Sequence, residues 1–184
     1  MSLYMESCCF IDVAKYTLER KDSIGDLADR EDHIQHCVKI LEAAKQRELR
    51  LFTANLTISE CQHLDGFIDD EVKRLFRSIL TSGRVVEIVT DSIFIAEQAR
   101  DLRWKHGICL SGADSHHVST ALEAGCEEFI TYDGKILKNA EKLKTLGLSV
   151  IRANETRLLG KEKRESEPKI IQDGLFDDSS ESIS

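Results

Sequence analysis

Short apolar runs alternate along this chain with longer segments that have helical periodicity. The apolar runs are 3–5, 49–53, 85–89, 128–131 and 148–151. The helical segments are 7–20, 33–48, 57–65, 69–80, 91–104, 112–124 and 133–146. Strands that alternate with helices predict a parallel sheet covered by helices on both faces. We therefore expect an α/β fold with three layers, α/β/α, around a parallel sheet of about five strands.

The chain changes composition near its C-terminal end. Its 184 residues suit a single domain. We assign that domain to 1–160, because the segment 161–184 is charged and rich in serine. Such a composition is typical of a flexible tail. The alternative is a segment that docks through its few apolar residues, Ile170, Ile171, Leu175 and Phe176.

Charge and cysteine content exclude some classes of protein. The net charge of −8 argues against a large surface that coats DNA non-specifically. It does not exclude a nuclease, because bound divalent cations add local positive charge. No apolar run approaches the roughly 18 residues of a membrane span. The six cysteines contain no C-x-x-C pair, and we expect no export signal, because no basic start followed by an apolar stretch is seen. We expect reduced thiols in a cytoplasmic protein, with a zinc site as the unsupported alternative.

Four acidic residues lie where strands end or helices begin. They are Glu6, Glu60, Asp114 and Asp133. In a parallel sheet the carboxyl ends of the strands share one edge, where ligands bind. We therefore expect these side chains to meet, although they are far apart in sequence.

Each acid also has a structural interpretation. Thr57-x-x-Glu60 and Ser111-x-x-Asp114 match the capping box, which places Glu60 in the first turn of its helix. Asp133 precedes a glycine, as in a turn, and Glu6 would gain from a helix dipole. As a set, however, four close carboxylates repel one another unless a cation neutralises them. Oxygen ligands favour Mg²⁺ or Mn²⁺, which can activate water against a phosphodiester.

Four short motifs, in order, resemble those of the PIN-domain family. They are YMESCCFID at 4–12, TANLTISE at 53–60, GADSHHVSTAL at 112–122 and FITYD at 129–133. The resemblance covers residues 3–151. Glu6 stands where the family usually has Asp, and its extra methylene moves the carboxylate outward by about 1.5 Å. Cys8 replaces the usual Asn.

The resemblance implies a metal-dependent endoribonuclease. Glu6, Glu60, Asp114 and Asp133 would bind Mg²⁺ or Mn²⁺, and hydrolysis would leave a 3′-hydroxyl and a 5′-phosphate. Ser7 and Thr131 would hold the ligands or water, and Asp12 would help from one side. Many family members of this size are VapC-like toxins, so the resemblance also implies an antitoxin partner and a homodimer.

Other polar residues have weaker functional interpretations. His117 is expected to be a packed histidine, and the pair His33 and His36 is a poor metal site. Candidate RNA contacts are Arg103 and Lys105, beside a half-buried Trp104, and Lys135 and Lys138 after Asp133. The alternative for these four basic residues is an ordinary solvated helix surface.

Two other functions remain open from the sequence. The first is a PIN-like scaffold that binds RNA or protein with weak or lost catalysis, suggested by Glu6 and the acidic surface. The second is a phosphatase-like enzyme with acids at the edge of a parallel sheet, which would need a nucleophilic acid and a well-placed lysine.

Overall fold

The computed structural model describes residues 2–18, 24, 27–64, 66 and 68–166. Its five strands are β1 (Ser2–Met5), β2 (Arg50–Ala54), β3 (Glu87–Val89), β4 (Glu128–Ile130) and β5 (Ser149–Ile151). They form one parallel sheet in the order β3-β2-β1-β4-β5. The predicted parallel sheet of about five strands is confirmed.

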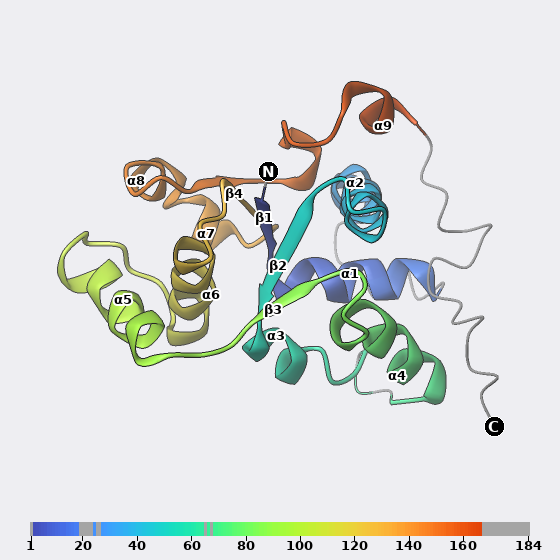
Figure 1. Cartoon of the computed structure of the whole chain (residues 1–184), viewed down its shortest axis with the longest axis horizontal. Coiled ribbons are helices and arrows are strands. Elements are labelled where there is room, and N and C mark those ends of the chain that lie inside the picture. Colours follow the sequence, from blue (N-terminus) through green and yellow to red (C-terminus); the bar gives the residue numbers. More distant parts are fainter. Residues whose placement is uncertain (1, 19–23, 25–26, 65, 67, 167–184) are drawn as a thin grey trace.

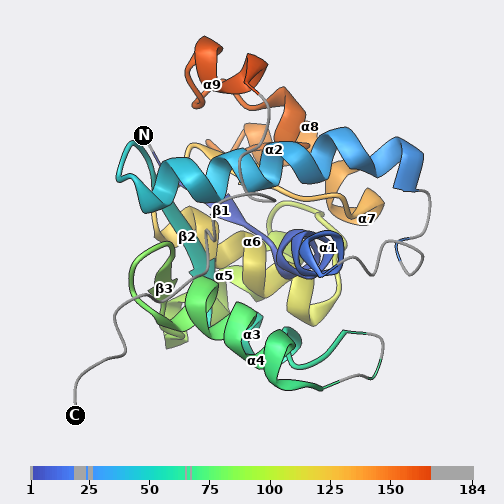
Figure 2. The ribbon, with the colours of Figure 1, turned by 90° about the vertical axis from the view of Figure 1, so that its right-hand side faces the viewer.

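Helices cover both faces of the sheet, as Figures 1 and 2 show. One side carries α1 (Ser7–Thr17), α2 (Leu27–Lys45) and α4 (Asp70–Phe76), which ends in a π turn at Arg77–Thr81. The other carries α5 (Ile93–Trp104), α6 (Gly112–Glu123), α7 (Gly134–Leu137) and α8 (Ala140–Lys144). The remaining helices are α3 (Asn55–Glu60), a 3₁₀ turn at Ala153–Glu155 and α9 (Lys161–Glu165). The predicted three-layer α/β/α architecture is therefore confirmed.

The strands separate two hydrophobic cores. Leu3 and Met5 lie in the core beneath α1 and α2, whereas Tyr4 between them lies in the core beneath α6. Successive side chains of a strand point to opposite faces, so a strand covered on both sides needs apolar residues at every position. This explains why the strands appear in the sequence as continuous apolar runs.

Several element boundaries differ from the sequence-based expectation. Helix α2 begins at Leu27 rather than 33, and Asp29 in its first turn interacts favourably with the helix dipole. The segment 133–146 is split into α7 and α8. Trp104 was expected to be half-buried, but it is 71% exposed, with the Arg100 guanidinium over its ring. In the described part of the chain, no helix is long and apolar enough to cross a membrane.

The segment after residue 160 begins with a helix that contacts α2. The Lys39 ammonium donates a hydrogen bond to the Arg164 carbonyl at 2.7 Å, and Lys163 lies 2.7 Å from Glu48. The rest of the predicted tail, 167–184, with its candidate docking residues, lies outside the described residues.

Candidate metal centre

The acids gather at the edge where the strands' carboxyl ends lie, here called the carboxyl edge. Glu6 follows β1 directly, and its amide donates to the Ile130 carbonyl at the end of β4, at 3.1 Å. The Thr131 hydroxyl donates a short hydrogen bond to Glu6 Oε2 and accepts one from the Asp133 amide, at 2.9 Å. Thr131 therefore joins two of the predicted acids across adjacent strands.

The environment of Glu6 opposes its negative charge. The side chain is 6% exposed, and burial raises the pKa of its carboxyl group above the ordinary value. Hydrogen bonds from Thr131 and from the Cys8 thiol, at 3.0 Å, act in the opposite direction, while the nearby charge of Asp133 raises the pKa further. A cation beside Glu6 and Asp133 would remove this penalty.

Glu60 lies at the end of its helix, not in the first turn. The predicted capping box at Thr57 is wrong, because α3 begins at Asn55 and Glu60 is its last residue. The Thr57 hydroxyl is buried and bonded to Thr53 at 2.7 Å, so it does not cap the helix. Glu60 still lies at the carboxyl edge, because α3 follows β2 directly.

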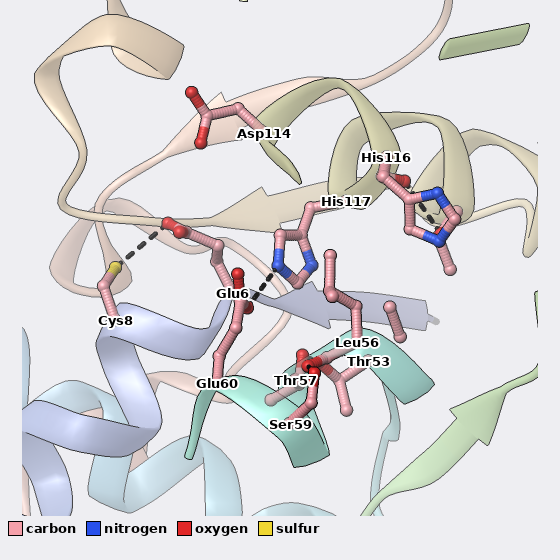
Figure 3. A network of polar contacts seen from close by, with 12 residues as sticks. Glu6, Cys8, Thr53, Leu56, Thr57, Ser59, Glu60, Asp114, His116 and His117 are labelled. Atoms are coloured by element: carbon pink, nitrogen blue, oxygen red, sulfur yellow. Dashed lines mark hydrogen bonds and ion pairs between the residues drawn. The ribbon is translucent and has the colours of Figure 1, made fainter. Parts of the chain in front are cut away.

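His117 holds the Glu60 carboxylate, as Figure 3 shows, with 2.7 Å between His117 Nε2 and Glu60 Oε2. Partial burial raises the pKa of Glu60, but the hydrogen bond and charge of His117, with a hydrogen bond from Ser7, outweigh it and lower the pKa below its ordinary value. The prediction of a packed histidine is confirmed, since His117 is 1% exposed. Its bond to Glu60 was not predicted.

A buried hydrogen-bond chain fixes the orientation of His117. The Ala54 amide donates to the Tyr4 hydroxyl at 3.0 Å, and that hydroxyl lies 2.7 Å from His117 Nδ1. The Glu60 carboxylate can only accept, so His117 Nε2 carries a proton and donates a hydrogen bond to Glu60. Burial raises the pKa of Tyr4 far above its ordinary value, so the hydroxyl stays protonated.

Asp114 lies apart from the Glu60–His117 pair, at the start of α6 (Figure 3). It forms the predicted capping box with Ser111, whose hydroxyl accepts from the Asp114 amide at 3.2 Å while its own amide donates to Asp114 Oδ2 at 3.4 Å. Among the described residues, no three of the four acids have ligand atoms all within 4.8 Å of one another. The structure thus brings Glu6 and Asp133 together most directly, through Thr131.

The donor set at the carboxyl edge fits a hard divalent cation. All four candidate ligands are carboxylates, and the charge of Asp133 raises the pKa of Glu6. Oxygen donors of this kind suit Mg²⁺ or Mn²⁺.

A second group, Cys9, His33 and Cys37, has ligand atoms within 4.8 Å of one another, but it does not fit a metal. The Ala153 amide donates to His33 Nδ1 at 3.0 Å. Burial lowers the pKa of His33 to about 4, so the ring is neutral and its proton lies on Nε2. That proton faces the two sulfur atoms, at 3.4 and 3.5 Å, and leaves no lone pair for a cation. The three residues form a hydrogen-bonded cluster in the core.

The other candidate site residues occupy different positions. Asp12 is buried on α1, 3.0 Å from the Arg30 guanidinium. Lys135 and Lys138 are exposed on and after α7, directly beyond Asp133.

Arg103 and Lys105 lie at the far end of α5. This helix starts after β3 at the carboxyl edge and runs 12 residues, a length of about 18 Å. Lys105 lies 2.7 Å from Asp101. These two residues are therefore remote from the acids, whereas Lys135 and Lys138 are near Asp133.

Comparison with known proteins gives one match. A family model described as PIN domain matches residues 24–142. No curated protein and no solved structure matches the chain.

Proposed function

The chain belongs to the PIN-domain family, a nuclease-type fold whose members are generally metal-dependent, and we propose that it is an endoribonuclease. Glu6, Glu60, Asp114 and Asp133 would hold Mg²⁺ or Mn²⁺, and the substrate would be RNA. The cation, when bound, supplies water activation and charge stabilisation at the phosphodiester. Both the four ligands and the choice of metal are part of what we propose.

One observation carries the proposal. The Thr131 hydroxyl links the Glu6 carboxylate to the Asp133 amide across two adjacent parallel strands. Glu6 is buried, and no ion pair to it is found in the described part of the chain, whereas a buried carboxylate needs a neutralising partner. Burial raises the pKa of Glu6, with a further contribution from the charge of Asp133, so a cation bound here would favour the ionised carboxylate.

The residues around the acids have distinct roles in this account. His117 orients Glu60 through Nε2–H, and Ser7 donates a hydrogen bond to the same carboxylate. Lys135 and Lys138 would contact the RNA phosphates. Asp12, paired with Arg30, would support α1 rather than contact the cation.

The direct experiment is cleavage of single-stranded RNA by purified protein with Mn²⁺. We expect products with a 3′-hydroxyl and a 5′-phosphate, and a loss of activity of at least about 100-fold in Glu60→Gln and Asp114→Asn, because removal of a ligand weakens both binding and charge stabilisation. Glu97→Gln, on the exposed surface of α5, is the matched control. Equal cleavage by all four proteins would refute the assignment.

A second candidate is a PIN-like scaffold that binds RNA without cutting it. Cys8 favours this function, because its thiol donates a hydrogen bond to Glu6 Oε2 at 3.0 Å, and Thr131 donates to the same oxygen. These two bonds use acceptor positions that a cation would need. Calorimetry with Mn²⁺ distinguishes the two candidates. Absence of binding in the wild type, with recovery in Glu6→Asp, would favour the scaffold. By contrast, a phosphatase-like function lacks support, because no lysine in the described part of the chain forms an ion pair with Glu6 or Asp133.

We further propose that the protein acts as a homodimeric toxin with an antitoxin partner, as VapC-like members do. The size of the chain and its four motifs support this assignment. All six cysteines are free thiols, which agrees with the proposed cytoplasmic location. A neighbouring reading frame that encodes a small DNA-binding protein would support the toxin assignment, and co-purification of the two proteins would test it.

A further inference from the structure

A cavity of about 560 Å³ opens between α3, the segment after β3 and α6. Its walls include Asn55, Leu56, Ser59, Asp91, Ala113 and His116. Ser59 directly precedes Glu60, and Ala113 directly precedes Asp114, so the cavity and the acids share two stretches of backbone. Figure 3 shows Leu56 and Ser59 on α3 and His116 on α6, the helices that carry Glu60 and Asp114. A ligand in this cavity would therefore lie at the same edge of the sheet as the acids.

The polar side chains of the cavity are available to a ligand. Asn55 is exposed at the start of α3, and its amide has no hydrogen-bond partner among the described residues. Asp91 is 54% exposed, and its carboxylate lies 3.5 Å from His116 Nε2. That single long contact leaves most of the acceptor capacity of Asp91 unused. The cavity therefore offers an amide and a carboxylate beside the apolar surface of Leu56.

These groups suit a nucleobase better than a phosphate. An anion in the cavity would be repelled by the Asp91 carboxylate. A nucleobase is neutral and flat, stacks on rings such as the imidazole of His116, and presents donors and acceptors along its edges. The volume lies within the roughly 300–1,000 Å³ of typical ligand pockets.

We propose that this cavity binds the nucleobase of the nucleotide next to the scissile phosphate, and that it prefers bases with an exocyclic amino group. The inference rests on the proposed function in that it takes RNA as the substrate. The Asp91 carboxylate accepts a hydrogen bond from such an amino group, and the Asn55 amide pairs with a neighbouring donor or acceptor, as Asn does with adenine. Uracil has no amino group, and its one donor on that edge, N3–H, lies between two carbonyl oxygens that a carboxylate repels.

The test measures binding without cleavage. Fluorescence anisotropy in EDTA compares labelled RNA hexamers of adenosine, cytidine and uridine. We expect the wild type to bind the adenosine and cytidine hexamers about tenfold more tightly than the uridine hexamer. Asp91→Asn should reduce this ratio to about twofold, because an amide can also donate to uracil. Asn55→Ala should reduce it as well, since the alanine cannot pair with a base edge.

Asp70→Asn is the matched control, because it removes one negative charge from the exposed start of α4, outside the cavity. It should leave the base preference unchanged. Equal affinities in the wild type, no binding of any hexamer, or a preference that survives Asp91→Asn would overturn the inference.

The same samples separate this inference from the proposed function. After Mn²⁺ is added, cleavage of all three hexamers with no base preference in EDTA would refute the nucleobase pocket and leave the endoribonuclease intact. A base preference in EDTA without cleavage in Mn²⁺ would support the pocket and refute the endoribonuclease.

Discussion

His117 Nε2 lies 2.7 Å from Glu60 Oε2, and the other ring nitrogen lies 2.7 Å from the Tyr4 hydroxyl. A backbone amide at the end of β2, that of Ala54, starts this chain of hydrogen bonds. These contacts connect β2, through Tyr4 and His117, to the Glu60 carboxylate. The orientation of a candidate metal ligand is therefore determined by a residue in the middle of the sheet.

Removal of the Tyr4 hydroxyl tests this chain. Tyr4→Phe leaves the Ala54 amide and His117 Nδ1 without a buried partner, which costs about 1–3 kcal/mol for each unsatisfied group. We expect the free energy of unfolding, measured by urea denaturation, to fall by that order. The affinity for Mn²⁺ should also fall, because His117, which holds Glu60, then loses the contact that orients its ring.

Tyr132→Phe is the control for this experiment, because the Tyr132 ring packs between Arg30 and Arg152 and no hydrogen bond of its hydroxyl is found in the described part of the chain. The free energy of unfolding of the Tyr132→Phe variant should differ from that of the wild type by less than about 0.5 kcal/mol. Equal effects of the two substitutions would contradict the proposed role of Tyr4.

Thr131→Val tests the link between Glu6 and Asp133. Valine keeps the shape of threonine but loses the hydroxyl that bonds both residues. Loss of a group that orients metal ligands typically weakens metal affinity 10–100-fold, so we expect a decrease of about that size by calorimetry. Thr17→Val, which removes a hydroxyl bonded within α1, should leave Mn²⁺ affinity unchanged. Unaltered affinity in Thr131→Val would mean that the two acids do not depend on this hydroxyl.

The lysines beyond Asp133 should contribute to RNA binding through phosphates. Replacing both Lys135 and Lys138 with Gln should reduce the slope of log affinity against log salt concentration by about one per lysine. The double variant Lys45→Gln/Arg47→Gln serves as the control, because these residues precede β2 at the opposite edge of the sheet. The measurement is fluorescence anisotropy in EDTA at several salt concentrations. Identical slopes for the two double variants would place the RNA elsewhere.

Stability should depend on pH through His33. Burial, together with the charges of Arg152 and Arg30, lowers its pKa from the ordinary 6.5 to about 4. The unfolded chain therefore takes up a proton at a higher pH than the folded chain. Neutral His33 makes its full contribution to the free energy of unfolding above pH 6.5. As pH falls toward 4, the unfolded chain binds the proton first, and this contribution decreases by up to about 3 kcal/mol.

Urea denaturation of wild type and His33→Gln between pH 7 and pH 4 checks this prediction. The wild type should lose more stability than the variant over that range, since Gln does not titrate. His106→Gln, an exposed position, should behave like the wild type. Parallel curves for wild type and His33→Gln would show that His33 titrates normally.

Much of the fold could be predicted because a parallel sheet buries both faces of its strands. Continuous apolar runs such as 3–5 then identify strands, and the order of strands and helices places Glu6 and Asp133 at one edge. The exact residue at which a short helix begins could not be predicted from these apolar runs. Thr57 matches an N-cap in sequence, but its hydroxyl is used by Thr53 from the preceding strand, and the helix starts two residues earlier.

Hydrogen bonds between residues far apart in the chain could not be predicted from the sequence either. Tyr4 and His117 are 113 residues apart, and nothing in either segment indicates their hydrogen bond. In the sequence Tyr4 is one apolar residue of a strand, and its hydroxyl gains partners only when β2 pairs with β1 and α6 packs on the sheet. The Asn55–Asp91 cavity likewise depends on how α3, the end of β3 and α6 converge.

The central claim is that the acids at the carboxyl edge act as one metal site, and Mn²⁺ calorimetry tests it most directly. Wild type should bind Mn²⁺, while Glu6→Gln and Asp133→Asn should each lose at least about tenfold in affinity. Glu87→Gln, on β3 and paired with Arg50, should bind like the wild type. If Glu6→Gln and Asp133→Asn bind Mn²⁺ as tightly as the wild type, the acids do not form one site and the account is contradicted.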